Sequence, residues 1–310
     1  MNITILGSGA MGCIYGGFLA ESGENQVTLV DIWKEHMDAI NQNGLVIMTP
    51  DGRERVVKNL KGVYSAAEAG PTELIIVFVK ATHTEEAMRQ ATNLADPETM
   101  VLTLQNGLGN VEKLCNVVPR KQVIAGTTAF GASIKGPGRI HQGGAGDTVI
   151  GELDGALTGR IEKIKGVLDR ANLSGKVADN VLGLIWSKLS VNVGINAIAS
   201  LCNIRNGQIL DYPESAALQE AAVKECVAVA QAKGIRFPDA DPLAHVREVT
   251  LKTGQNTCSM LQDVLAKRQT EIAVINGAVV AAGQETGLAT PVNWVLTNLI
   301  KTIQSSYPQA

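Results

Sequence analysis

The chain contains 310 residues, enough for two domains, and its 45% hydrophobic and 18% charged residues are typical of a globular protein with a packed core. The net charge of −3 and the 4% aromatic content argue against nucleic acid and an anionic membrane surface as partners. The longest apolar stretch, residues 181–202, contains a lysine and two asparagines, which argues against a transmembrane helix.

The cysteines and histidines indicate neither disulfides nor a metal site. The five cysteines form no Cys-x-x-Cys pair and their number is odd, so we expect free, mostly buried thiols in a reducing, cytoplasmic environment. The N-terminus leads directly into a strand without a basic segment, so we expect no signal peptide. The histidines lack metal-ligand spacing, and we expect them at the surface or at helix ends: His36, His83, His141 and His245.

The first half of the chain alternates strand and helix patterns. Apolar strands are predicted at 2–6, 27–30, 74–79 and 100–104, followed by a helix at 159–171 and a short strand at 176–178. The run 74–79 is uninterrupted, as in a parallel strand covered on both faces. Residues 123–151 predict antiparallel strands near the sheet edge, with a turn at 136–138. The alternation predicts a doubly wound α/β domain of the Rossmann type over residues 1–175.

The second half contains helical patterns only. Glycine and proline breakers separate helices predicted at 181–202, 214–233, 242–253, 259–286 and 291–304. These form an all-α C-terminal domain over residues 176–310. Because no long linker separates the two halves, we expect a cleft between the domains, a common place for ligands. The apolar C-terminal helices could support a homodimer.

A glycine-rich turn connects the first strand to the helix that follows it. Its residues are Gly7, Ser8, Gly9, Ala10, Met11 and Gly12. Gly7 permits a tight turn, Gly9 lets the backbone approach a pyrophosphate, and Gly12 lets the helix pack on the strand. Asp31 ends the next strand, where a carboxylate binds the adenosine ribose hydroxyls and repels a 2′-phosphate. This favours NAD(H), with NADP(H) as the alternative because Lys34 is close.

Lys188 is the only charged residue between residues 181 and 204. Asn192 and Asn196 follow it at intervals of four, which places the three side chains on one helix face. A buried ammonium is costly, and desolvation lowers its pKa. The stripe therefore indicates a wet, functional cleft. The alternative is a solvent-facing stripe on an amphipathic helix, but such helices usually show several mixed charges.

Further motifs follow the glycine turn in a fixed order. They are Val79-Lys80 at a strand end, Gln105-Asn106-Gly107 after the next strand, Lys188 with its asparagines, Asn206-Gly207, and a block running from Ser259-Met260-Leu261-Gln262-Asp263 through Thr270-Glu271-Ile272 to Ile275-Asn276-Gly277. Together they resemble the ketopantoate reductase (2-dehydropantoate 2-reductase) family. The resemblance covers essentially the whole chain, and its last block is the most specific part.

The resemblance implies a nicotinamide-dependent reduction of the small 2-oxo acid 2-dehydropantoate to pantoate, on the route to pantothenate and coenzyme A. The catalytic positions that it implies are Lys188 and Glu271. The substrate-binding positions that it implies are Asn192, Asn196, Asn206, Asn256 and Ser259, and the positions beside the nicotinamide are Lys80 and Asn106. Asp31 departs from the basic residue of NADPH-using members. It leaves open a paralogue that acts on another 2-oxo or 2-hydroxy acid.

The chemistry assigned to these residues follows from the reaction. Lys188 would donate a hydrogen bond to the carbonyl oxygen and then protonate the alkoxide. Glu271 would accept a hydrogen bond from the substrate's terminal hydroxyl, although the residues alone leave it a solvated carboxylate. Ser259 would help to hold the substrate carboxylate, and with Gln262 it is also predicted to cap a helix. A dinucleotide-binding redox sensor is a non-enzymatic rival, but it would not need Lys188 and Glu271.

Overall fold

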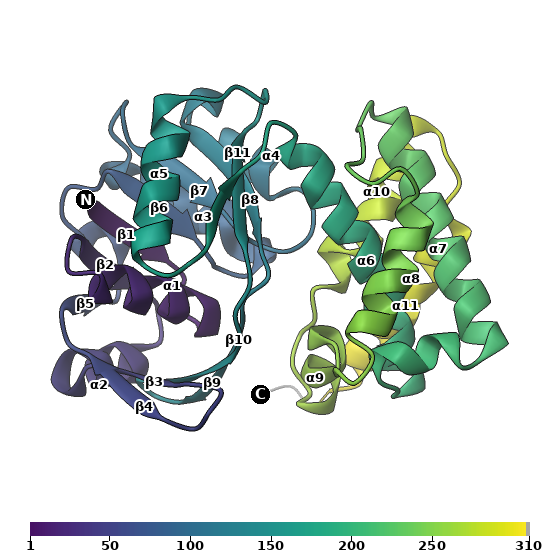
Figure 1. The fold of residues 1–310 in the computed structure, drawn as a ribbon, viewed down its shortest axis with the longest axis horizontal. Helices are drawn as coiled ribbons and strands as arrows, with labels where there is room; N and C mark the ends of the chain where they lie inside the picture. Colours follow the sequence, from purple (N-terminus) through teal and green to yellow (C-terminus); the bar gives the residue numbers. More distant parts are fainter. Residues whose placement is uncertain (308–310) are drawn as a thin grey trace. The chain divides into compact units, whose positions relative to one another are not determined.

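The computed structural model describes residues 1–307, which form two compact units (Figure 1). The α/β unit comprises Met1–Gln105 and Asn110–Val181. The helical unit comprises Asn106–Gly109 and the described part of Leu182–Ala310. The chain therefore joins the helical unit briefly at residues 106–109, returns to the α/β unit, and enters the helical unit again at Leu182.

A large sheet forms the centre of the α/β unit, with strand order β12-β11-β8-β7-β6-β1-β2-β5. Its strands are β1 (Asn2–Leu6), β2 (Gln26–Val30), β5 (Leu60–Val63), β6 (Leu74–Val77), β7 (Met100–Thr103), β8 (Val123–Thr128), β11 (Thr148–Glu152) and β12 (Gly175–Val177). Neighbouring strands are parallel except β8 and β11. The chain order reverses beside β1, and ligands of such sheets bind beyond the strand ends at this point. The predicted Rossmann-type domain is confirmed.

A second, smaller sheet was not predicted. Its order is β4-β3-β10-β9, and its strands are β3 (Leu45–Met48), β4 (Glu54–Val57), β9 (Gly131–Gly136) and β10 (Arg139–Gly144). The predicted turn at 136–138 does join the antiparallel pair β9 and β10. The expectation that all of 123–151 lies at the edge of the large sheet was wrong, because β10 pairs with β3 instead. Only β8 and β11 belong to the large sheet.

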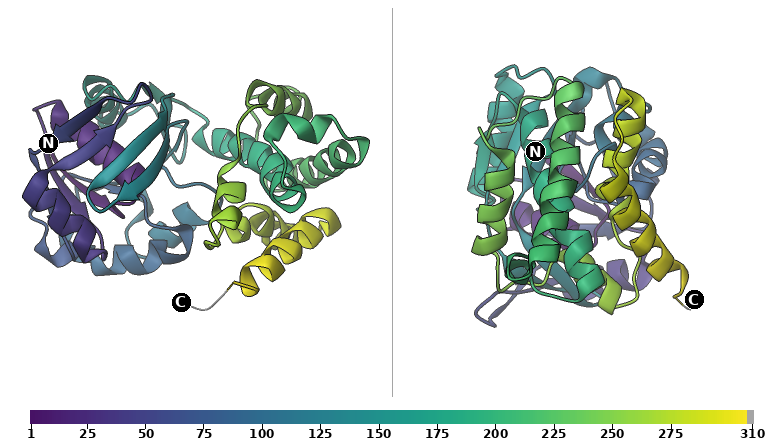
Figure 2. Two further views of the ribbon diagram at one scale, coloured as in Figure 1. Left: turned by 90° about the horizontal axis from the view of Figure 1, so that it is seen from below. Right: turned by 90° about the vertical axis from the view of Figure 1, so that its right-hand side faces the viewer.

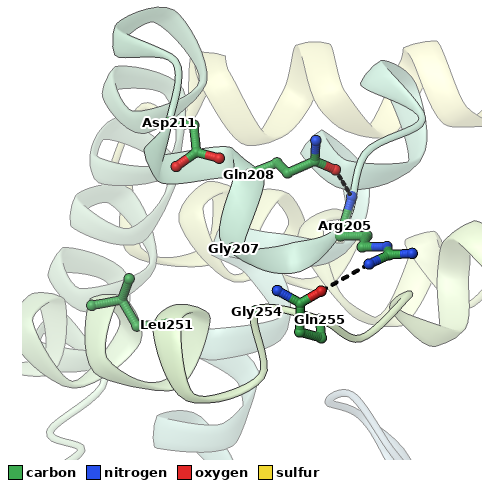
Figure 3. A pocket seen from close by; sticks show the side chains of 7 residues that line it. All are labelled: Arg205, Gly207, Gln208, Asp211, Leu251, Gly254 and Gln255. Carbon is green, nitrogen blue, oxygen red and sulfur yellow. Dashed lines mark hydrogen bonds between the residues drawn. The ribbon is translucent and has the colours of Figure 1, made fainter.

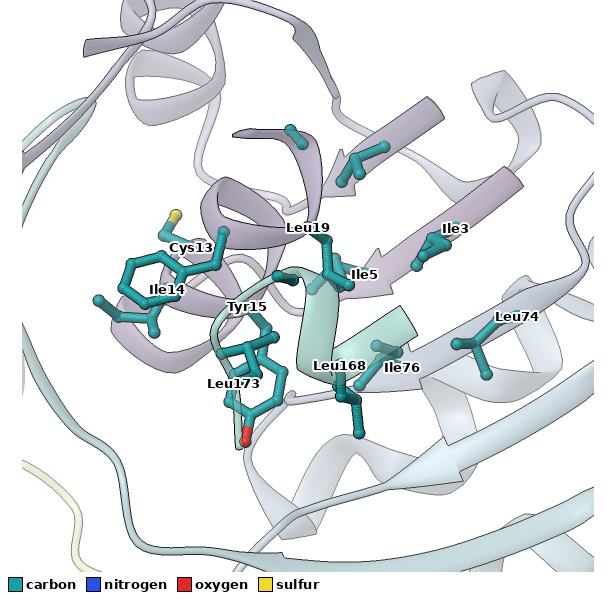
Figure 4. Packing of buried hydrophobic residues seen from close by; sticks show 14 of the residues in the cluster. Ile3, Ile5, Cys13, Ile14, Tyr15, Leu19, Leu74, Ile76, Leu168 and Leu173 are labelled. Carbon is teal, nitrogen blue, oxygen red and sulfur yellow. The ribbon is translucent and has the colours of Figure 1, made fainter. Parts of the chain in front are cut away.

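Helix α1 (Ala10–Glu21) packs against strands of both sheets, which explains why it is buried on nearly all sides. A Cβ atom on Gly16 would lie 2.4 Å from Leu29 Cδ2 in β2. One on Gly17 would lie 2.7 Å from Ile47 Cδ1 in β3. The two glycines therefore let both sheets approach the same helix. Figure 4 shows α1 packing with β1, β6 and α5 in the core. The other helices of this unit are α2 (Lys34–Asn43), α3 (Thr84–Gln90), α4 (Asn110–Cys115) and α5 (Gly159–Arg170).

The helical unit is an assembly of helices that pack side by side (Figure 2). They are α6 (Val181–Cys202), α7 (Pro213–Ala232), α8 (Pro242–Lys252), α9 (Ser259–Leu265), α10 (Asn276–Thr286) and α11 (Pro291–Ser305). The predicted all-α domain is confirmed. Proline occupies the first turn of α7, α8 and α11, where its missing N–H is not needed.

The single helix predicted over 259–286 was wrong, because the chain breaks between α9 and α10. Lys267 adopts a left-handed backbone with φ +52°. Its N–H and that of Arg268 bond back to the carbonyls of Val264 and Asp263, at 3.0 and 2.8 Å, which closes the end of α9. A short 3₁₀ turn, η6 (Ile272–Val274), then precedes α10. Glu271 therefore lies in the break rather than within a helix.

Helix α6 is the central helix of this unit. A Cβ atom on Gly194 would lie 2.9 Å from Val223 in α7 and 3.0 Å from Val246 in α8, so this glycine lets both helices approach closely. By length and composition α6 could cross a membrane, but 67% of its most apolar window is buried within the protein, as expected for a core helix. Its polar stripe therefore stands out against an otherwise apolar, packed helix.

Candidate functional site

The glycine turn between β1 and α1 has the shape of a dinucleotide cradle. Gly7 has φ +90°, and a Cβ atom there would lie 2.4 Å from the backbone nitrogen of Val79. A Cβ atom on Gly12 would lie 2.1 Å from the carbonyl oxygen of Gly7. At Gly9, by contrast, a Cβ atom would meet nothing within 4 Å. No side chain caps α1 at Gly9, so its first N–H groups are suited to bind an anion such as a pyrophosphate.

Asp31 follows β2 and is tied to this turn. Its Oδ2 accepts a hydrogen bond of 2.9 Å from the Ser8 N–H, and its Oδ1 accepts one of 3.0 Å from the Trp33 N–H. Each carboxylate oxygen can accept a second bond, so hydroxyl groups of a ribose can still be bound. Ile32, the next residue, is 87% exposed. Asp31 thus combines a structural role in the turn with the position expected of a ribose ligand.

His36 is a residue of the cofactor region that sequence reasoning missed. It was expected at the surface or at a helix end; it does lie in the first turn of α2, but its side chain is 0% exposed. Its Nδ1 accepts a hydrogen bond of 2.9 Å from the Gly138 N–H, and its Nε2 lies 3.1 Å from the carbonyl oxygen of Ser8. The ring also stacks on Trp33, with centroids 4.7 Å apart. A signal did exist, since His36 shares the buried face of α2 with Met37 and Ile40.

These contacts fix the protonation of His36. Because Nδ1 accepts from Gly138, the ring proton is on Nε2, which donates to Ser8. Burial lowers the pKa of His36, against the opposing influence of Asp31, so the neutral ring is favoured. Ser8 is thereby held through its N–H by Asp31 and through its carbonyl by His36. The neutral imidazole connects the glycine turn to the β9–β10 turn at Gly138.

The ends of β6 and β7 carry the next predicted residues. Lys80 is exposed and precedes a 3₁₀ turn, η2 (Ala81–His83). Gln105 holds the two strand ends together, since its Nε2 donates to the Val79 carbonyl at 2.6 Å and to Thr84 Oγ1 at 2.8 Å. Asn106, the residue after it, belongs to the helical unit.

Asn106, Lys188 and Glu271 come together within the helical unit. Asn106 Nδ2 donates a hydrogen bond of 3.1 Å to Glu271 Oε2. Burial lowers the pKa of Lys188 from 10.5 to about 8, while the charge of Glu271 opposes this by favouring the ammonium. Lys188 as a whole residue is half-buried. The arrangement is a proton donor with a pKa near neutrality beside an oriented carboxylate, as in sites for general acid catalysis.

Asn192 and Asn196 continue from Lys188 along α6. Asn192 is half-buried, and Asn196 is 5% exposed. Cys258 Sγ lies 3.7 Å from the Asn196 carbonyl oxygen, which brings the start of α9 against this part of α6. Cys258, and not Ser259 as predicted, caps α9, because its Sγ accepts from the Leu261 N–H at 3.4 Å. Ser259 is exposed as the first residue of the helix.

Asn206 and Asn256 form a separate pair. The Asn206 N–H bonds to the Asn256 carbonyl at 3.1 Å, and Asn206 Nδ2 donates to Thr253 Oγ1 at 3.0 Å. The Asn206 side chain is 6% exposed, whereas Asn256 is exposed. Both neighbour a hollow of about 430 Å³, shown in Figure 3. Its lining residues are Arg205, Gly207, Gln208, Asp211, Leu251, Gly254 and Gln255.

Cysteines and metal ligands complete the description of the site region. Cys13, Cys115, Cys202, Cys226 and Cys258 are all free thiols. Within residues 1–307, no three His, Cys, Asp or Glu side chains are grouped so that they could hold a metal ion.

Comparison with known families decides the relationship. The family model described as "Ketopantoate reductase PanE/ApbA" matches residues 3–155, and "Ketopantoate reductase PanE/ApbA C terminal" matches residues 180–304. The chain belongs to the ketopantoate reductase family. A 2-dehydropantoate 2-reductase of Halobacterium salinarum is 34% identical over 98% of this chain and 99% of its own length. One of Pyrococcus horikoshii is 36% identical over 98% of both chains. The resemblance inferred from the sequence motifs is confirmed.

Solved structures of ketopantoate reductase relatives share the fold over the full length. A D-mandelate dehydrogenase, solved in a ternary structure with NADH and anilino(oxo)acetate, has a TM-score of 0.91 at 30% identity and covers 99% of both chains. A PanE/ApbA family ketopantoate reductase from Ralstonia eutropha has a TM-score of 0.88 at 29% identity and covers 98% of this chain and 99% of its own. The NADH bound by the first of these supports a nicotinamide cofactor.

Proposed function

We propose that this chain is a 2-dehydropantoate 2-reductase, which reduces the 2-oxo group of ketopantoate to the hydroxyl of pantoate. The observation that carries the proposal is the arrangement of Lys188, Glu271 and Asn106. It places a lysine with a pKa of about 8 beside a carboxylate that an amide holds in place. Relatives of the same length named for this reaction support the choice of substrate.

Lys188 is proposed as the general acid. A nicotinamide bound to the α/β unit supplies the hydride to C2 of the substrate. The Lys188 ammonium donates a hydrogen bond to the carbonyl oxygen and stabilises the negative charge that develops there. It then transfers a proton to that oxygen, and the product is a neutral hydroxyl and a neutral amine. With a pKa of about 8, about nine-tenths of Lys188 is protonated at pH 7.

Glu271 is proposed to recognise the terminal hydroxyl of ketopantoate. Its Oε2 already accepts from Asn106, and the other oxygen of the carboxylate remains an acceptor for a substrate hydroxyl. Its charge also keeps more of Lys188 protonated than burial alone would allow. The substrate carboxylate would be bound by neutral donors from Asn192, Asn196 and Ser259. The other two predicted substrate residues, Asn206 and Asn256, pair with each other, and the Asn206 amide already donates to Thr253.

The cofactor proposed for this chain is NAD(H), with a cytoplasmic location. Gly7–Gly12 and Asp31 would hold the dinucleotide, with Lys80 close to its nicotinamide end. Asp31 is an acceptor at the place where a 2′-phosphate would need a cation, which disfavours NADP(H). The structural similarity to an NADH-bound dehydrogenase supports the same preference.

A second candidate function is an NADH-dependent reductase of another 2-oxo acid. Two observations favour it. The TM-score to D-mandelate dehydrogenase is 0.91 over nearly the full length, and Asp31 favours NAD(H), the cofactor bound in that structure. The two candidates differ in the substrate's terminal hydroxyl, because an aromatic 2-oxo acid would leave Glu271 without that partner.

Steady-state turnover with a matched pair of substrates separates the candidates. Ketopantoate and 3,3-dimethyl-2-oxobutanoate differ only in the terminal hydroxyl, and each would be assayed with NADH and with NADPH. We expect ketopantoate with NADH to have the highest kcat/KM, with a preference of at least ~10² over the analogue, since a site that binds a hydroxyl strongly rejects a substrate without one. Equal kcat/KM for the two substrates would remove the hydroxyl-recognition role and favour the second candidate. A preference for NADPH would overturn the role of Asp31.

A further inference from the structure

The segment between β7 and α4 docks on the helical unit at two points. Asn106 Nδ2 donates to Glu271 Oε2 at 3.1 Å, and the Leu108 N–H donates to the Val274 carbonyl at 3.0 Å. The Leu108 side chain packs against the apolar core of the helical unit. Glu271 is the N-cap of η6 and Val274 is its last residue, and the Val274 N–H donates to the Glu271 carbonyl at 3.0 Å. The spacing of the two docking points is therefore fixed.

Gly107, between these points, has no room for a side chain. Its φ is +81°, and a Cβ atom would lie 2.4 Å from the Val274 carbonyl oxygen and 2.7 Å from Val274 Cγ2. The carbonyl oxygen is backbone, so it cannot move away by a rotamer change. Gly109, two residues later, has a similar φ of +87°, but a Cβ atom there would meet nothing within 4 Å. An alanine causes comparable backbone strain at both positions and a steric clash only at Gly107.

We propose that Gly107 and Leu108 are positioning residues for the reaction, because their close docking on Val274 holds Asn106 against Glu271. This inference rests on the proposed function, since it concerns the same carboxylate. The Glu271 backbone is held as the N-cap of η6, because its carbonyl accepts from the Val274 and Ile275 N–H groups, but these bonds do not fix its side chain. The Asn106 contact therefore orients the carboxylate, and the anchor at Gly107–Leu108 keeps Asn106 in place.

The two glycines provide a matched pair of variants. Gly107→Ala moves the loop away from Val274, so we expect kcat with ketopantoate to fall about 100-fold, because a misplacement of about 1 Å at a reacting site can cost that much. Gly109→Ala should retain kcat within about threefold, with dinucleotide affinity unchanged in both variants. Gly107→Ala should also move the alkaline limb of the pH profile to lower pH, because Glu271 would no longer support the Lys188 ammonium. Equal kinetic losses in the two variants would overturn the proposal.

A double-variant comparison tests whether Gly107 acts through Asn106. If it does, Gly107→Ala should cause little further loss of kcat in an Asn106→Ala background, whereas independent effects would multiply. Multiplied losses would contradict the inference even if Gly107→Ala alone is impaired.

Hydrogen exchange at the Leu108 amide provides a readout that does not depend on turnover. Protection is expected in the wild type and in Gly109→Ala, and its loss in Gly107→Ala. If the wild type fails to reduce ketopantoate, the proposed function fails. The exchange data then decide whether the anchor exists, and the kinetic comparison is made with the 2-oxo acid that is turned over. An unprotected Leu108 amide in the wild type would refute the anchor directly.

Discussion

The pH dependence of turnover is the most direct consequence of the buried lysine. Lys188 has a pKa of about 8 instead of 10.5, and only its protonated form can deliver a proton to the alkoxide. At pH 9 about one-tenth of the enzyme carries that proton, compared with about nine-tenths at pH 7. We therefore expect kcat/KM for ketopantoate reduction to fall about tenfold between pH 7 and pH 9. Oxidation of pantoate requires the neutral amine and should show the opposite trend.

The perturbation that isolates the cause is Glu271→Gln. The amide keeps the size of the side chain and removes its charge, so the pKa of Lys188 loses the influence that opposes burial. The alkaline limb should then move to lower pH, in addition to any loss of substrate affinity. Asp263→Asn is a suitable control, because this carboxylate lies on α9 and pairs with Arg268 at 2.9 Å.

The assay is the initial rate of NADH oxidation from pH 6 to pH 10, at limiting ketopantoate and saturating cofactor. A limb near pH 8 that moves in Glu271→Gln and stays in Asp263→Asn supports the assignment. A limb near pH 10 would show that burial does not lower the pKa of Lys188, and a limb that is identical in wild type and Glu271→Gln would show that Glu271 does not influence it. Solvent viscosity should be varied as well, since a diffusion-limited step would mask the limb.

Two further variants test the energetics of the site. Lys188→Met should abolish reduction yet raise the free energy of unfolding at pH 7 by about 1–3 kcal/mol, because the difference between a pKa of 10.5 and about 8 corresponds to about 3 kcal/mol. The buried ammonium lowers the free energy of unfolding of the wild type fully below pH 8, and this effect disappears as the pH rises towards 10.5. The difference in unfolding free energy between wild type and Lys188→Met, measured by denaturant titration, should therefore be smaller at pH 10 than at pH 7. His36→Phe keeps a ring on Trp33 but leaves the buried Gly138 N–H without its acceptor, while the Ser8 carbonyl keeps only the Cys13 thiol as a donor. It should lower the free energy of unfolding by about 1–3 kcal/mol and weaken NADH binding. Unchanged NADH affinity by fluorescence titration would exclude His36 from positioning the glycine turn.

The sequence could predict long elements because each contained its own signals. Helix α6 was predicted with its observed bounds, since breakers flank its long apolar run. The small sheet was missed because β3 and β4 have only four residues each, and β3 pairs with β10, which lies about a hundred residues further along the chain. Short strands carry little periodic signal, and their partners are set by tertiary structure.

The glycine turn and the lysine stripe illustrate the same distinction for the site. Gly7 and Gly12 are needed for local backbone geometry, so their spacing alone indicates the cradle. Asn106 and Glu271 are 165 residues apart, and nothing in either segment shows that they meet. The sequence placed Asn106 correctly after a strand but could not reveal that it belongs with the helical unit.

The break in the predicted helix 259–286 allows the contact between Asn106 and Glu271 to form. In a continuous α-helix the Val274 carbonyl would accept the N–H four residues later, and it would not be available to Leu108. The left-handed Lys267 ends α9, and the chain resumes as η6, so the carbonyl of Val274 accepts from Leu108 at 3.0 Å instead. Glu271, which precedes the same turn, accepts a hydrogen bond from the Asn106 side chain. The departure from regular helix thus lies at the carboxylate that is proposed to bind the substrate, and functional positions are where local patterns are expected to fail.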